Sequence, residues 1–204
     1  TEYGADANLN HQTEFLGESL NWTKEFYPET FQTKMHEYQW SVIEKHPYII
    51  ASYLWNMFDF ACPMWERGGV PARNMKGLVT FDREVKKDAY YWYKANWTIN
   101  PVLYLTQRRN MDRETRETCI TVYSNIGLPT LSLNGRILKN VRQGYTKVHY
   151  IFDEVILDEG ENVVRAIVIG KNGEEYTDEV RWQYKGEKQR LVDSKENKNS
   201  HSGF

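Results

Sequence analysis

The sequence predicts an α/β region over residues 1–98, an immunoglobulin-like antiparallel β-sandwich over residues 99–185, and a polar tail or linker over residues 186–204. All but one of the seven Trp and all but one of the five Met lie within residues 1–97. That region mixes helical and strand patterns, whereas residues 101–185 consist of short strand-like segments separated by turns. The last nineteen residues are polar and low in apolar content, which favours a frayed end or a linker.

The first region contains the pattern of a strand-helix-strand unit. An apolar stripe predicts a helix over residues 29–45, with Pro28 suited to its first turn and Pro47 ending it. The stripe consists of Phe31, Met35, Tyr38 and Val42. Residues 48–55 then read as a strand that is apolar on both faces, as in parallel sheets covered by helices. With a short strand before the helix, this order predicts a βαβ unit, the repeat of an α/β barrel or a doubly wound sheet. A second helix is predicted over residues 85–96.

The second region reads as a series of antiparallel strands. The predicted strands cover residues 102–107, 118–124, 130–133, 147–155, 162–169 and 179–184. Asn134-Gly135 and Asn172-Gly173 are hairpin turn signals. Short strands with frequent turns predict a β-sandwich of immunoglobulin type.

Composition excludes several classes of function. The chain has 26 Lys and Arg against 28 Asp and Glu, so it lacks the basic surplus of a nucleic-acid binder. The longest uncharged run, residues 47–58, is too short to span a bilayer. Cys62 and Cys119 are far apart and form no zinc pattern, so we expect two structural thiols and neither a metal nor a cofactor. Because the chain opens in mid-motif, we expect it to be part of a longer protein, which leaves the compartment open between periplasm and cytoplasm.

The candidate chemistry lies at the predicted strand ends. Catalytic groups of an α/β barrel project from the C-terminal ends of its strands. Glu2 would end the first strand, and Trp55, Asn56 and Asp59 would follow the second. A carboxylate can attack an anomeric carbon and a Trp face can stack on a sugar ring, so this combination is compatible with a carbohydrate site.

Four motifs in order resemble glycoside hydrolase family 2, which contains β-galactosidases, β-glucuronidases and β-mannosidases. Thr1–Asp6 looks like the nucleophile strand of that family, and Leu54–Phe60 resembles its eighth barrel strand. Asn74–Arg83 is similar to the loop that follows, and Lys86–Trp97 to the last barrel helix. The resemblance implies the C-terminal part of a TIM (α/β)8 barrel followed by an immunoglobulin-like β-sandwich, as in many bacterial members.

By this resemblance Glu2 is the nucleophile of a retaining exo-β-glycosidase. Such an enzyme removes a terminal β-galactoside or β-glucuronide by double displacement through a covalent glycosyl-enzyme. The general acid of the family lies upstream of Glu2, and Glu14, Glu18 and Glu25 do not match it. We therefore expect the 204-residue chain to be inactive alone, with a carbohydrate substrate and the remainder of its own chain, upstream sandwich domains and barrel strands included, as its partners.

The resemblance also suggests substrate-binding residues. Trp55 matches the family's sugar-stacking Trp. Asp59 either binds a sugar hydroxyl or braces its loop, and Tyr3 either hydrogen-bonds the nucleophile or packs below it. Asn74 and Lys76 form an Asn-x-Lys pattern that can clamp a carboxylate through an amide and an ammonium.

The identity of the sugar stays open between galactose and glucuronic acid. The Asn-x-Lys pattern grips the sugar acid in β-glucuronidases, but many β-galactosidases carry a similar string. The β-glucuronidase loop has an Arg four positions before the Asn, where this chain has Val70. Lys86 and Lys87 read as members of structural ion pairs or of solvated faces. The alternative function is a non-catalytic carbohydrate-binding or architectural module, and the oligomeric state, a homo-oligomer included, is left open.

Overall fold

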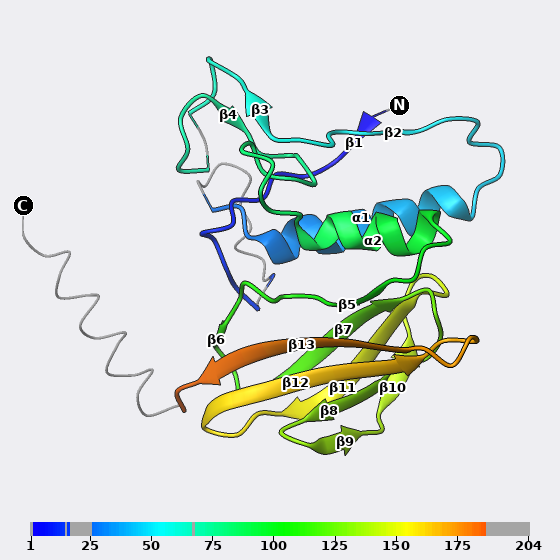
Figure 1. The fold of residues 1–204 in the computed structure, drawn as a ribbon. Coiled ribbons are helices and arrows are strands. Elements are labelled where there is room, and N and C mark those ends of the chain that lie inside the picture. The colour runs from blue at the N-terminus through cyan, green and yellow to red at the C-terminus, as the bar shows by residue number, and fades with distance from the viewer. Residues whose placement is uncertain (1, 15, 17–25, 67, 187–204) are drawn as a thin grey trace, which may run out of the picture.

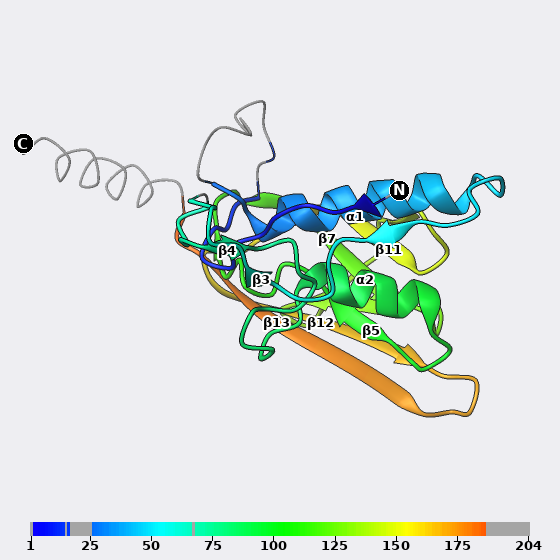
Figure 2. The same cartoon turned by 90° about the horizontal axis from the view of Figure 1, so that it is seen from above.

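Three layers make up the molecule (Figure 1). The computed structural model describes residues 2–14, 16, 26–66 and 68–186; the predicted tail beyond Gly186 lies outside them, as do Thr1, Glu18 and Glu25. Short strands form the upper layer, two helices the middle layer and a β-sandwich the lower layer. Figure 2 shows helices α1 and α2 side by side.

The upper and middle layers begin with a βαβ unit. Strand β1 (Glu2–Tyr3) pairs in parallel with β2 (Tyr53–Leu54), and α1 (Glu29–Glu44) connects them. This pairing agrees with the predicted order and with the predicted helix. The predicted strand over residues 48–55 is wrong in extent and burial, since β2 contains only two of its residues and Ile50 is 100% exposed. Residues 48–51 are exposed and belong to none of the described helices or strands.

The buried face of α1 is polar. The predicted apolar stripe is partly buried at most, and Tyr38 is 55% exposed. Gln32, His36 and Glu37 are buried instead. The Gln32 amide donates to the backbone carbonyls of Ala5 and Gly77, while the Tyr123 hydroxyl donates to Glu37 at 2.5 Å. These partners offset the cost of burying polar groups between two layers. The apolar stripe therefore predicted the wrong buried face of α1.

The upper layer continues through an antiparallel pair, β3 (Phe60–Ala61) and β4 (Arg73–Asn74), before α2 (Asp88–Trp97). The second helix therefore starts three residues after its predicted start at Val85. The Val85 N–H donates instead to the Thr80 hydroxyl and the Val85 carbonyl accepts the Thr80 N–H, so the chain turns before the helix begins. Within the described residues, neither helix combines the length and apolar composition needed to cross a membrane.

Two sheets form the lower layer, as predicted. One has the order β10-β11-β7-β5 and the other β6-β13-β12-β8-β9. The strands of the first sheet are β5 (Leu103–Leu105), β7 (Glu117–Ser124), β10 (Val141–Gln143) and β11 (His149–Ile156). Those of the second are β6 (Asp112–Arg113), β8 (Thr130–Leu133), β9 (Arg136–Leu138), β12 (Gly160–Ile169) and β13 (Glu175–Tyr184). Every predicted strand corresponds to one of these, while β6, β9 and β10 were not predicted.

The sandwich encloses a continuous apolar core. Trp182 is 1% exposed and packs with Phe152, Leu131 and Val164 from both sheets. Asn134-Gly135 forms the turn between β8 and β9 with positive φ angles of 50° and 80°, as its sequence predicts.

The middle layer is joined to the sandwich by aromatic and ionic contacts. Trp92 of α2 is fully buried and packs against Tyr123 and Val148 of the sandwich. Arg109 donates through Nε to Glu29 at 2.7 Å and through Nη2 to Asp88 at 2.7 Å, linking the sandwich to both helices. The helices are therefore held between the strands above and the sandwich below.

We expect His36 to make folding sensitive to acid. Its ring is fully buried with Nδ1 2.9 Å from the Tyr93 hydroxyl, and burial, with a smaller effect of the Lys87 charge, lowers the pKa of His36 from 6.5 to about 3. Below pH 6.5 the unfolded chain takes up a proton that the folded chain does not, so His36 should lower the free energy of unfolding by about 1.4 kcal/mol per pH unit. Urea unfolding measured between pH 6 and 4 gives the dependence of the unfolding free energy on pH. In His36→Gln this dependence should be weaker by that amount, and an equal dependence in both proteins would contradict the role of His36.

Candidate functional site

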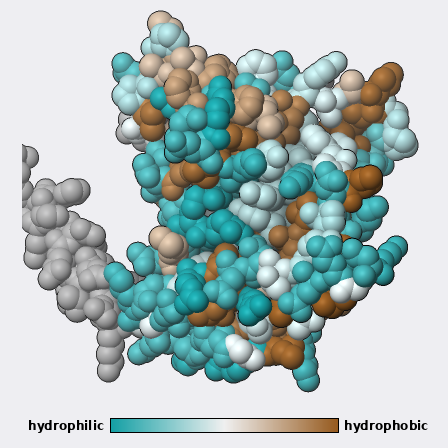
Figure 3. Space-filling view, viewed as in Figure 1, coloured by the Kyte–Doolittle hydropathy of each residue, from teal (hydrophilic) through white to brown (hydrophobic). Residues whose placement is uncertain are grey.

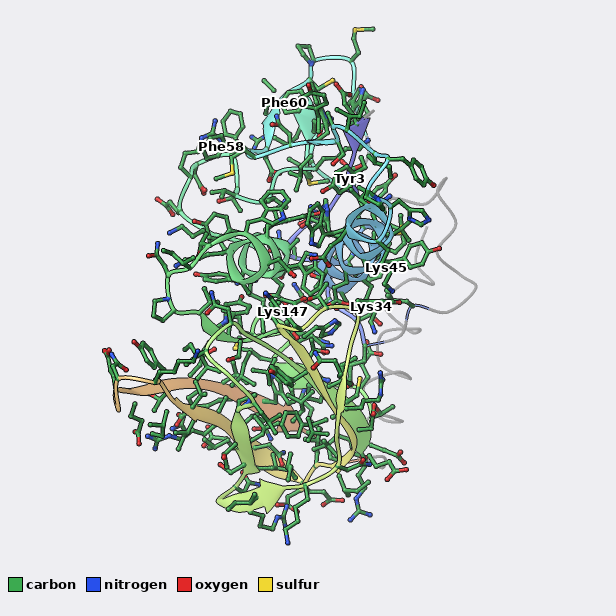
Figure 4. All side chains as sticks on the ribbon, turned by 90° about the vertical axis from the view of Figure 1, so that its right-hand side faces the viewer. Tyr3, Lys34, Lys45, Phe58, Phe60 and Lys147 are labelled. Atoms are coloured by element: carbon green, nitrogen blue, oxygen red, sulfur yellow. The ribbon has the colours of Figure 1, made fainter. Side chains whose placement is uncertain are left out.

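One hollow in the upper layer collects most of the predicted site residues. This upper hollow has a volume of about 420 Å³. It is lined by Glu2, Tyr3, Gly4, Trp55, Phe60, Cys62, Trp65, Asn74 and Lys76. In Figure 4, Tyr3 and Phe60 lie in the layer above the helices, on the side away from the sandwich. The ends of β1, β2 and β4 therefore meet at one place.

Three backbone segments form the floor of the upper hollow. The Trp55 N–H donates to the Tyr3 carbonyl at 2.7 Å, and the Trp55–Asn56 peptide is cis. The Asn56 N–H donates in turn to the Lys76 carbonyl at 3.1 Å. A Cβ on Gly4 would lie 1.9 Å from the Trp55 carbonyl oxygen, so only glycine fits there. The segments that contain Glu2, Trp55 and Lys76 are thereby placed side by side.

Two opposite charges of the upper hollow are available to a ligand. Glu2 is exposed and Lys76 is half-buried. Within the described part of the chain, neither the Glu2 carboxylate nor the Lys76 ammonium has a hydrogen-bond or ion-pair partner. A bound molecule can therefore meet a carboxylate and a cation in the same space.

Aromatic rings form the remaining walls. Trp55 is 37% exposed and stands edge-on to Phe60, with ring centroids 5.8 Å apart and an interplanar angle of 84°. Tyr3 packs below, its ring 6.0 Å from His36 and 6.5 Å from Tyr93, and burial raises the pKa of its hydroxyl. An exposed indole face beside polar groups is suited to stacking on a flat or ring-shaped ligand.

Asn74 and Lys76 share a tight loop. Asn74 is 3% exposed, and its amide oxygen accepts the Lys76 backbone N–H at 3.0 Å. The Asn74 amide also carries two N–H donors, and no described group accepts from them. Both residues therefore present donors to the upper hollow.

Asp59 lies outside the upper hollow. It is 5% exposed, and its Oδ1 accepts the Gly77 N–H at 2.8 Å and the Lys87 ammonium at 2.9 Å. A Cβ on Gly77 would lie 2.0 Å from the Asp59 nitrogen, so the contact requires glycine. Of its two expected roles, these contacts correspond to bracing the loop.

Glu14, a described carboxylate of the following loop, is held by the lower layer. Glu14 accepts hydrogen bonds from Arg113 and Thr118 of the lower layer. Among the residues that line the upper hollow, Glu2 is the one carboxylate. No group of three or more His, Cys, Asp and Glu side chains within the described ranges is arranged to hold a metal.

Sequence reasoning missed Phe60, Cys62 and Trp65 as lining residues and misread Lys87. The first three stand in an irregular segment where no period marks a buried face. Lys87, expected in a structural ion pair or on a solvated face, does pair with Asp59 but is fully buried, whereas the neighbouring Lys86 is exposed. Only the tertiary contacts of Lys87 distinguish it from Lys86.

Comparison with known proteins finds relatives that are named beta-glucuronidase or beta-galactosidase. No family model matches the chain. A protein of Bacteroides fragilis named beta-glucuronidase is 36% identical over 188 residues, which are 91% of this chain and 26% of that protein. The crystal structure of a "putative beta-galactosidase" from B. fragilis has a TM-score of 0.89 and 70% identity, covering 94% of this chain and 28% of that one. An FMN-binding beta-glucuronidase from Faecalibacterium prausnitzii has a TM-score of 0.76 and 35% identity, covering 90% and 26%. The chain thus spans about a quarter of these relatives.

Proposed function

We propose, from its similarity to β-glucuronidases and a β-galactosidase of which it spans about a quarter, that the chain is the C-terminal part of a retaining exo-β-glycosidase of their family. In this proposal residues 1–98 complete a TIM barrel, and residues 99–185 form the immunoglobulin-like domain behind it. The observation that supports it most is the upper hollow, where Glu2, Trp55, Asn74 and Lys76 meet.

In the proposed reaction Glu2 is the nucleophile. A carboxylic acid from the remainder of the protein protonates the leaving glycosidic oxygen while a Glu2 oxygen attacks the anomeric carbon from the opposite face. The bond to the aglycone breaks and a glycosyl ester with Glu2 forms. The acid residue, now a base, takes a proton from water, and the resulting attack on the anomeric carbon releases the sugar and the Glu2 carboxylate. Trp55 stacks on the sugar ring.

The other groups of the upper hollow bear on the choice of sugar. The Lys76 ammonium and the Asn74 NH₂ can donate together to the carboxylate of a β-glucuronide. A β-galactoside offers these donors only neutral hydroxyls. Activity of the full-length protein toward a panel of nitrophenyl β-glycosides tests the proposal. If none of them is hydrolysed, the enzyme proposal fails and the alternative, a non-catalytic carbohydrate-binding or architectural module, is favoured.

Lys76→Ala should separate the two sugars. If the substrate is a uronide, loss of a charge-assisted contact of about 1.5–3 kcal/mol should lower kcat/KM roughly 10- to 100-fold for that substrate alone. Lys86→Ala removes an exposed lysine outside the upper hollow and is the matched control. It should leave kcat/KM unchanged for both sugars. Equal losses of kcat/KM on glucuronide and galactoside would mean that Lys76 only holds its loop.

The 204-residue chain by itself should not turn over any β-glycoside. It lacks a second carboxylate at the upper hollow, and apolar side chains gather on its upper layer (Figure 3). Ile50 and Met64 are 100% and 90% exposed there, as expected of surfaces that the remainder of the protein covers. An assay with nitrophenyl glycosides, with the full-length protein as control, checks this; turnover by the chain alone would contradict the need for an acid from outside.

A further inference from the structure

Lys87 occupies an unusual position for a lysine. It directly precedes α2 and is fully buried. Its ammonium donates to the Ala7 carbonyl at 3.0 Å, the Met75 carbonyl at 3.0 Å and Asp59 Oδ1 at 2.9 Å. An ammonium has three N–H donors, so all of them are used.

The three acceptors come from the three segments around the upper hollow. Ala7 lies on the segment that begins with Glu2, five residues further along the chain. Met75 stands between Asn74 and Lys76, and Asp59 follows Trp55 by four residues. One buried group therefore fixes the nucleophile motif, the stacking Trp segment and the sugar-recognition loop relative to one another.

Further bonds extend this connection to the loop backbone. Asp59 Oδ1 also accepts the Gly77 N–H, and the Ala7 N–H donates to the same Met75 carbonyl that Lys87 contacts. Burial lowers the pKa of Lys87 and raises that of Asp59, while the attraction between them opposes both shifts. A buried ion pair is weak evidence for stability, but it can select one geometry over alternatives.

We propose that Lys87 is a positioning residue that holds the Asn74–Lys76 loop in register with Glu2 and thereby sets the preference among sugars. The part concerning sugars rests on the proposed function. The part concerning the loop does not, because it follows from the hydrogen bonds alone. Lys87 itself does not line the upper hollow, so it acts through the loop and not by touching substrate.

Hydrogen exchange in the full-length protein tests the loop. In Lys87→Met, backbone amides of residues 75–78 should exchange at least about 10-fold faster, while those of β12 in the sandwich should stay within about 2-fold. Lys86→Met is the matched control and should leave both segments unchanged. If Lys87→Met does not fold, Asp59→Asn should raise exchange at Gly77, since it weakens the same connection. Unchanged exchange of the loop, or an equal rise in loop and sandwich, would overturn the proposal.

Steady-state kinetics test the preference. Lys87→Met should lower the ratio of kcat/KM for the preferred sugar to kcat/KM for the other sugar about 10-fold, mainly by raising KM for the preferred sugar. Lys76→Ala should shift this ratio in the same direction. A uniform loss on all sugars would show a structural role only. If the wild-type protein hydrolyses no glycoside, the proposed function fails, and the exchange experiment still decides whether Lys87 orders the loop.

Discussion

Glu2→Gln in the full-length protein is expected to lower kcat for its β-glycoside substrate by at least about 10³-fold, or about 4 kcal/mol in activation free energy. The amide has nearly the shape of the carboxylate but cannot form the glycosyl ester. Because the Glu2 side chain is exposed and its carboxylate has no hydrogen-bond or ion-pair partner in the described part of the chain, thermal unfolding should hardly change. The kinetics are measured with a nitrophenyl β-glycoside beside the melting temperature.

The control for this substitution is another exposed carboxylate, Glu84. Glu84→Gln removes a charge from the loop between β4 and α2, outside the upper hollow, and should leave kcat unchanged. Wild-type turnover by Glu2→Gln would exclude Glu2 as the nucleophile.

Arg109→Met should destabilise the chain by about 3 kcal/mol. The Arg109 side chain is 22% exposed, but its partners Glu29 and Asp88 are 3% and 2% exposed. Its removal leaves two neighbouring buried carboxylates without their cation, and the linkage between sandwich and helices is lost. Urea unfolding of the chain at pH 7 measures the change.

A surface ion pair provides the matched comparison. Arg136 pairs with Asp158 at 2.8 Å, with side-chain exposures of 59% and 47%. Solvent screens such pairs, so Arg136→Met should cost less than about 1 kcal/mol. Similar losses for Arg109→Met and Arg136→Met would mean that the buried cluster does not hold the layers together.

Local signals in the sequence predicted the parts of the fold that local physics determines. The Asn134-Gly135 turn needs positive φ angles, which these residue types adopt readily, and its hairpin was predicted. Helix α1 ends within one residue of its predicted end. Its buried face could not be predicted, because Gln32 and Glu37 are buried only through partners distant in sequence.

The candidate site divides in the same way. Every predicted site residue except Asp59 lines the upper hollow, because the motifs mark strand ends that the parallel pairing of β1 and β2 brings together. Trp65 and Cys62 reach the same space from an irregular loop that no period describes. Lys86 and Lys87 are adjacent and chemically identical, and only packing buries the second.

Covalent labelling tests most directly whether Glu2 is the nucleophile of a retaining glycosidase. The full-length protein is incubated with a 2-deoxy-2-fluoro glycosyl fluoride of its preferred sugar, which slows hydrolysis of the glycosyl ester, and the labelled peptide is sequenced by mass spectrometry. We expect one sugar per chain, esterified to Glu2, with activity lost in proportion to labelling. A label on any other carboxylate would contradict the account.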